Sequence, residues 1–193
     1  MSNIIKKLQL TTLGACLTLA LSAGVVSTAV NAASEADEVS AAQAAKISLK
    51  QAITTASKHA SGILINAEFN DDDSDAKDGG AVYELEFSTG TMGYEIKVDA
   101  TTGKIVKTET ERLDRDDLAD YKAQQQAKIK MMDAMNIAEK QTGGRILEIE
   151  FKNDRDYANH ASYYETQLLK GNSLLWLNID ADTGSTFKNK FKK

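Results

Sequence analysis

Apolar and polar residues alternate along much of this chain, with the period of two that is typical of β-strands with one buried face. Alternating runs begin at Ile63, Tyr83 and Tyr94, and a fourth, shorter run covers 104–109. Turn-forming residues separate the runs. The pattern therefore predicts a four-stranded antiparallel meander.

The segment before the first strand shows helical spacing instead. Ser48 is a suitable N-cap, Gln51 completes a capping box with it, and Gly62 stands where a left-handed residue would end a helix. One helix and four strands predict a two-layer α+β unit whose helix covers one face of the sheet. We expect the opposite face to contact water, because it carries charged residues. These residues are Glu84, Glu86, Glu95 and Lys97.

One turn sequence occurs twice, at 98–104 and at 179–185, each time after an alternating run. In both copies an Asp can accept hydrogen bonds from backbone N–H groups two or three residues later, and a Gly supplies a positive φ. We predict a structural role for these residues in β-hairpin turns. They are Asp99, Thr102 and Gly103 in the first copy and Asp180, Thr183 and Gly184 in the second.

The repetition extends beyond the turns, which indicates a tandem duplication. Ile47 corresponds to Ile129 (129 − 47 = 82), and Asp99 corresponds to Asp180 (180 − 99 = 81), so one residue was lost between them. The predicted fold class is α+β, with two similar units, each one helix packed on a four-stranded antiparallel sheet. The predicted layout is a signal peptide over 1–32, a flexible tether over 33–45, the first unit over 46–110, a helical or partly helical connector over 111–127 and the second unit over 128–193.

The first 32 residues have the pattern of a secretory signal peptide. Lys6 and Lys7 precede a mostly apolar run, and small residues before Ala33 predict cleavage there. A retained anchor is the alternative, but Thr, Ser and Gly dilute the run. Apolar sequence continues past Cys16, the only Cys, which disfavours lipidation at that position. We expect a bacterial periplasmic or secreted protein with no stable membrane insertion after cleavage.

The charge of the mature chain limits its partners. The leader holds two lysines and no acids, so 21 basic and 28 acidic side chains remain, a formal charge of −7 (21 − 28). Nucleic-acid and anionic membrane surfaces need clustered Lys and Arg. We therefore expect no nucleic-acid partner.

Candidate chemistry is sparse. The acidic loop from Asp71 to Asp78 resembles a calcium loop, but Ala76 and Val82 stand where an EF-hand needs Gly and Glu. The only histidines, His59 and His160, lie at non-equivalent places, so we assign no metal site and no cofactor. The chain has no Gly-x-Ser-x-Gly elbow. We assign no catalytic residue and expect that the protein is not an enzyme.

Two stretches resemble a known family. Ile47 to Ala52 reads Ile-Ser-Leu-Lys-Gln-Ala, and Tyr94 to Ile105 reads Tyr-Glu-x-x-Val-Asp-x-x-Thr-Gly-Lys-Ile. This pattern resembles the PepSY domain, and the second unit resembles a diverged copy. The resemblance implies inhibition or regulation of a peptidase, because the family occurs in propeptides of thermolysin-like metalloproteases, and it implies no catalytic residues. No protease domain follows Lys193 in this sequence, so we expect action in trans.

The leading hypothesis is an exported, non-enzymatic binding module that inhibits a peptidase or regulates envelope proteolysis. A sheet edge that pairs with an extended peptide would supply the contact. The alternative is an envelope sensor or scaffold that binds a small ligand or cation between the two units. Trp176, the only Trp, is either half-buried between the units or a partner contact. The sequence assigns neither the binding surface nor the oligomeric state.

Overall fold

The computed structural model describes residues 27–76, 79–113, 115–154 and 156–192. Most of the predicted signal peptide, including Cys16, lies outside these ranges. α2 (Ser27–Ala44) precedes the first unit, which contains α3 (Leu49–Ala56), β1 (Ile63–Asn70), β2 (Val82–Ser88), β3 (Met92–Asp99) and β4 (Ile105–Arg112). α4 (Arg115–Gln126) precedes the second unit, which contains α5 (Met131–Thr142), β5 (Arg145–Asn153), β6 (Ser162–Lys170), β7 (Ser173–Asp180) and β8 (Thr186–Lys188).

The structure confirms the predicted α+β class, with one helix packed on four antiparallel strands in each unit. Ser48 caps α3 in a capping box with Gln51, as its sequence predicts. The helix ends at Ala56, before the expected end at Gly62. Gly62 serves the strand instead, because a Cβ there would lie 1.9 Å from the Ser88 carbonyl oxygen.

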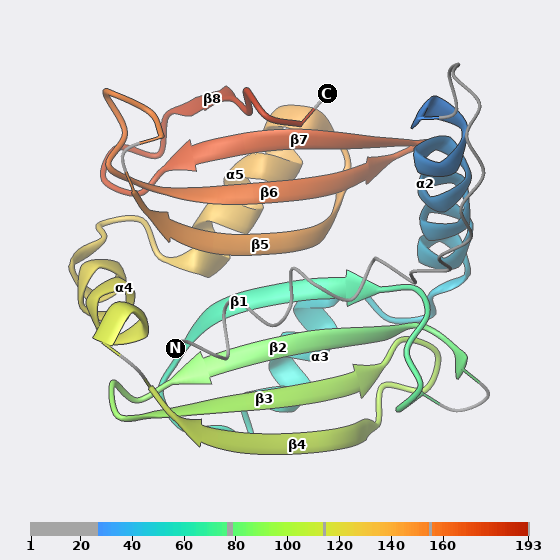
Figure 1. Ribbon diagram of the computed structural model, residues 1–193, viewed down its shortest axis with the longest axis horizontal. Helices are drawn as coiled ribbons and strands as arrows, with labels where there is room; N and C mark the ends of the chain where they lie inside the picture. The colour runs from blue at the N-terminus through green and yellow to red at the C-terminus, as the bar shows by residue number, and fades with distance from the viewer. Residues whose placement is uncertain (1–26, 77–78, 114, 155, 193) are drawn as a thin grey trace, which may run out of the picture.

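The two four-stranded sheets join into one sheet with the strand order β4-β3-β2-β1-β5-β6-β7-β8. In Figure 1, α3 and α5 lie behind this sheet, and α4 and α2 lie to its left and right, beside the ends of the strands. Ala67 of β1 pairs with Ile149 of β5. Since 149 − 67 = 82 is the repeat offset, equivalent residues face each other there, and the two units are related by a pseudo-two-fold axis at this seam.

Residues 33–44 lie in α2, where the sequence analysis expects a flexible tether, so that expectation is wrong. Val39 and Ala42 of this helix are buried. The carbonyl oxygen of Ala42 accepts a hydrogen bond from Arg145, and Gln43 Nε2 donates to the Gly171 carbonyl oxygen at 3.1 Å. The segment is rich in Ala, which favours helix, and these contacts hold the helix against the second unit.

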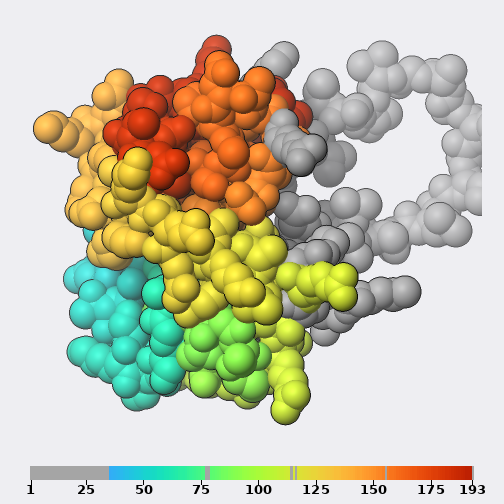
Figure 2. Space-filling model, turned by 90° about the vertical axis from the view of Figure 1, so that its left-hand side faces the viewer, coloured from blue at the N-terminus to red at the C-terminus, as the bar shows by residue number. Residues whose placement is uncertain are grey.

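α4 is the counterpart of α2 in the repeat, since 115 − 82 = 33 and 126 − 82 = 44. Gln124 Nε2 donates to the Leu64 carbonyl oxygen at 2.8 Å, and Tyr121 lies against Gly90 in the β2–β3 turn of the first unit. Figure 2 shows 115–126, in yellow, across the junction between the units. Each unit therefore sends the helix that precedes it onto the other unit. Neither α2 nor any other helix of the described residues is long and apolar enough to cross a membrane.

Candidate functional site

The two predicted turns hold their Asp side chains in the same way. Asp99 Oδ1 accepts from the backbone N–H of Thr101 at 3.0 Å and of Thr102 at 2.6 Å. Asp180 Oδ1 accepts from the backbone N–H of Thr183 at 2.8 Å and from the Thr183 hydroxyl at 2.8 Å. Gly103 and Gly184 have φ values of 71° and 72°. These Asp and Thr side chains therefore form hydrogen bonds within their own turns.

Each turn also supports the start of a helix. The backbone N–H of Ile47, just before α3, donates to the Ala100 carbonyl oxygen at 3.2 Å. In the second unit the N–H of Ile129 donates to the Ala181 carbonyl oxygen at 2.9 Å. These contacts explain structurally why the same turn sequence occurs in both units.

The two histidines are not brought together, since His59 follows α3 and His160 lies beside the second turn. His160 Nδ1 is 2.6 Å from Asp180 Oδ2, and its ring stacks on Phe187 with centroids 3.9 Å apart. Burial alone would raise the pKa of Asp180, but hydrogen bonds from His160 and Thr183 lower that pKa to about 2. The pair fastens the turn to the sheet.

The acidic loop that follows β1 is held by a lysine of the sheet. Lys97 Nζ lies 2.6 Å from Asp73, 3.1 Å from Asp75 and 3.2 Å from Glu84. Burial lowers the pKa of Lys97, yet the three carboxylates together raise it well above its usual range. The Lys97 ammonium group thus occupies the position between these acids that a bound metal cation would need.

The expectation that this sheet face contacts water is wrong for three of its four predicted residues. Glu84, Glu86 and Lys97 are buried. Lys97 forms ion pairs with Asp73 of the acidic loop and with Glu84, while Glu86 lies beneath α4. The strand pattern alone could not reveal this, because the covering elements are distant in sequence.

The second unit exchanges these polar partners. Glu84 pairs in register with Lys97, and its counterpart Glu165 pairs in register with Asn178. The lysine of the second unit is Lys152 on β5, which lies 2.5 Å from Glu150. Since Lys152 corresponds to Asn70 (152 − 82 = 70) and Asn178 corresponds to Lys97 (178 − 81 = 97), lysine and asparagine have changed places between the two units.

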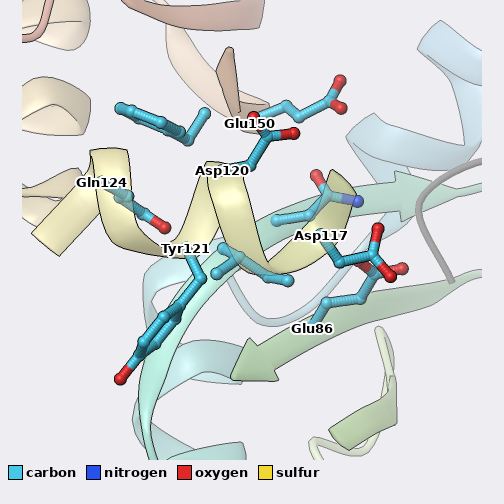
Figure 3. Close-up of a pocket in the computed structure, with 9 residues that line it drawn as sticks. Glu86, Asp117, Asp120, Tyr121, Gln124 and Glu150 are labelled. Carbon is cyan, nitrogen blue, oxygen red and sulfur yellow. The ribbon is translucent and has the colours of Figure 1, made fainter. Parts of the chain in front are cut away.

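A small cavity lies beside the seam, between α4 and the strands β1, β2 and β5 (Figure 3). Its volume is about 10 Å³, roughly the space of one water molecule. The polar residues that line it are Asn66, Glu86, Asp117, Asp120, Gln124 and Glu150. Of the described lining residues, none is basic.

Several oxygens in this cavity have no hydrogen-bond partner among the described residues. They are both carboxylate oxygens of Glu86, Asn66 Oδ1 and Gln124 Oε1. Glu86 is only 1% exposed. Burial, with added repulsion from Glu95 and Glu150, raises the pKa of Glu86 to about 8. A buried carboxylate without a partner is costly, so this position needs an explanation.

Two more carboxylates lie near the pseudo-two-fold axis. Burial, followed by repulsion from Glu148, raises the pKa of Glu68 to about 9. Burial and repulsion from Glu150 raise the pKa of Glu148 to about 7. The sequence analysis missed this cluster. Its signal in the sequence was a single acid on β1, Glu68, and two acids at alternate positions of β5, Glu148 and Glu150.

The remaining surfaces are an apolar groove, an outer strand and the single Trp. The groove has a volume of about 390 Å³ and lies on the helix side, lined in part by Ile53, Phe87 and Met131. β4, at one edge of the sheet, pairs only with β3 in the strand order. Trp176 is half-buried, with Lys192 Nζ 4.3 Å from its ring centroid, and it lies on β7 rather than at the β1–β5 seam.

Comparison with protein families finds a match in each unit. The PepSY model, described as peptidase propeptide and YPEB domain, matches residues 46–109 and 128–188. A solved structure from Clostridium difficile 630, provisionally described as a lipoprotein, aligns with a TM-score of 0.42 at 21% identity, over 75% of this chain and 92% of that chain. Among curated proteins, no match is found.

Proposed function

The chain belongs to the PepSY family, and on that premise we propose that it is an exported, non-enzymatic module that binds a peptidase and restrains it. The family description names peptidase propeptides, which supports a peptidase as the protein partner. Both matched regions are two-layer units, and their outermost strands, β4 and β8, form the two opposite edges of the joined sheet. The proposed contact is made by backbone groups of such an edge.

The observation that carries the proposal is the outer strand β4. Its eight residues, Ile105–Arg112, are half-buried or exposed. An outer strand presents unpaired N–H and C=O groups, to which an extended peptide can add as a further strand. The other outer strand, β8, has three residues and is followed by the buried Asn189, which donates to Glu165 at 2.7 Å. β4 is therefore the better edge for a peptide.

The test measures cleavage of a peptide substrate by a co-exported or thermolysin-like metallopeptidase at rising concentrations of the protein. We expect inhibition at micromolar concentrations. Val106→Lys places a charge on the β4 edge and should weaken inhibition about tenfold, or about 1.4 kcal/mol. Met132→Lys on α5 is the matched control, since Met132 and Val106 are 40% and 38% exposed. Equal inhibition by both variants would contradict a β4 contact.

Export is part of the same proposal. Cleavage before Ala33 would keep residues 33–44 of α2, including the buried Val39 and Ala42. N-terminal sequencing of protein recovered from the envelope or medium should begin at Ala33. A chain that retains Met1 in that fraction would contradict processing.

A second function is favoured by the seam cavity. An envelope sensor or scaffold needs a ligand site between the units, and this cavity is lined by residues of both, including Glu86 and Glu150. Its unpartnered oxygens favour a ligand that offers positive charge. A ligand-dependent change in melting temperature without any peptidase inhibition would favour this function over the first.

A further inference from the structure

β4 forms one outer edge of the joined sheet, opposite β8 (Figure 1). At the open end of the β3–β4 ladder, the backbone N–H of Leu113 donates to the Thr91 carbonyl oxygen at 3.2 Å. Because the backbone groups of successive residues point to opposite sides of a strand, the odd-numbered residues of β4 from Lys107 onward point toward β3. The N–H and C=O groups of Thr108 and Thr110 therefore point outward, where a further strand can reach them.

The charged side chains of β4 follow one another on a single face of the sheet. Lys107 and Glu109 pair in register with Lys97 and Glu95, so both lie on the polar face, and Thr108 between them lies on the other face. Lys107 Nζ is 3.1 Å from Glu109 Oε1. A lysine and a glutamate two residues apart on an outer strand are complementary to the same pair on a strand that runs in the opposite direction.

We propose that two copies of this chain form a symmetric dimer in which their β4 strands pair antiparallel, with the two-fold axis at Thr108. Thr108 faces Thr108 of the other copy as a hydrogen-bonded pair, because its backbone groups point outward. Lys107 of each copy faces Glu109 of the other. The four side chains form a ring of alternating charges on the polar face, and the two sheets become one continuous sheet.

Charge selects this register over the neighbouring symmetric ones. An axis at Lys107 or at Glu109 sets that residue against its own copy, and an axis at Thr110 sets Glu109 against Glu111 on both sides. Like charges directly opposite each other destabilise a strand pair, whereas opposite charges stabilise it. The axis at Thr108 places Lys107 and Glu109 against each other twice and forms no like-charge pair between them.

The chain already joins two of its own units in this way. β1 and β5 pair antiparallel at the pseudo-two-fold axis, where Ala67 faces Ile149. The proposed dimer repeats this edge-to-edge join between copies. Pairing of β4 with β8 of another copy would instead extend without end. β8 offers only the three residues Thr186–Lys188 for such a join, so the closed β4–β4 dimer is favoured.

The dimer has a consequence for inhibition. One strand pair buries less surface than a standard interface, so we expect a weak dimer with a Kd on the order of 10–100 µM. Below that concentration β4 is free to receive a peptide, and above it the second copy covers the same edge. The dimer would therefore limit inhibition at high concentration. This consequence rests on the proposed function, whereas formation of the dimer does not.

Sedimentation velocity of the purified protein at about 1–300 µM tests the dimer. The wild type should pass from monomer to dimer without larger species. Lys107→Glu and Glu109→Lys each set like charges against each other on both sides of the axis, and each should weaken the dimer about tenfold. Lys188→Glu on β8 changes the net charge as Lys107→Glu does and should dimerise like the wild type. A monomeric wild type, species larger than the dimer, or undiminished association of either β4 variant would overturn the proposal.

An equal mixture of Lys107→Glu and Glu109→Lys separates the proposed pairing from damage to the fold. In the mixed dimer, two acids of one chain face two lysines of the other, so the mixture should dimerise although neither variant does so alone. A variant that had lost its fold could not recover in this way. A mixture that stays monomeric would overturn the register.

Peptidase inhibition is measured separately at about 1 µM, below the expected Kd of the dimer. Inhibition by a protein that stays monomeric at every concentration would overturn this inference and leave the proposed function intact. A dimer that follows the charge pattern but inhibits no peptidase would support this inference and count against the proposed function.

Discussion

At the scale of single residues, Glu86 makes the stability of the protein depend on pH. In the folded protein the pKa of Glu86 is about 8, so the Glu86 carboxyl keeps its proton up to about that pH. In the unfolded chain the ordinary Glu pKa of 4.5 applies. Between these values the folded state binds more protons, so the free energy of unfolding decreases as pH rises and levels off above about 8. Glu68 and Glu148 act in the same direction.

This dependence can be measured by urea unfolding at several pH values between 5 and 9. The midpoint should fall steadily for the wild type, and Glu86→Gln should show a shallower fall because one of the three groups is removed. A midpoint that increases with pH in this window would contradict the assignment of protonated carboxyls at the seam.

Lys97 is the residue that neutralises the acidic loop. Lys97→Met should destabilise the fold by about 3–5 kcal/mol, because it leaves buried Asp73 and Glu84 carboxylates without a counter-charge. Lys107→Met is the control, since Lys107 is 33% exposed and should cost less than about 1 kcal/mol. Chemical denaturation of both variants checks this. Similar small losses would show that the loop does not depend on Lys97.

The sequence predicts residues whose role is local. Asp99 and Asp180 accept from N–H groups within three residues, so their turn is encoded in a short stretch. Glu86 is different, because its burial depends on α4, which begins some distance along the chain. A charged residue on a strand therefore resembles a solvent-exposed one until the covering helix is known.

At the scale of elements, helices that pack on a distant unit were the hardest to predict. α3 has a capping box and an apolar face that both lie within one segment. α2 has few large apolar residues, and within 35–44, where side-chain burial is described, Val39 and Ala42 are the buried ones. Its packing surface is supplied by the second unit, including Gly171. The segment alone therefore predicted a tether.

The docking of α4 can be tested at Gly90, which has φ of 85° in the β2–β3 turn. A Cβ there would lie 2.6 Å from Tyr121 Cε1, whereas the equivalent Gly171 has φ of 62° and nothing within 4 Å. Gly171→Ala should cost about 1–2 kcal/mol from backbone strain alone. Gly90→Ala should cost clearly more, as measured by thermal unfolding. Equal losses would mean that α4 does not rest on this turn.

At the scale of the whole molecule, the repeat predicted two units but not how they join. Alternation identifies a strand and its buried face, yet it does not show which neighbour pairs with each edge. The β1–β5 pairing consumes one edge of each unit and leaves β4 and β8 outermost. β8 is short, and the Asn189 that follows it donates a hydrogen bond to Glu165. Of the two strands that the β1–β5 pairing leaves outermost, β4 is therefore the more accessible edge.

Hydrogen–deuterium exchange of the protein with and without a peptidase that it inhibits tests the proposed β4 contact most directly. Strand addition gives new partners to backbone N–H groups of the receiving edge. We predict slower exchange over Ile105–Arg112 in the complex, with little change over Thr186–Lys188. Unchanged exchange along β4 at saturating peptidase would contradict the proposed mode of binding.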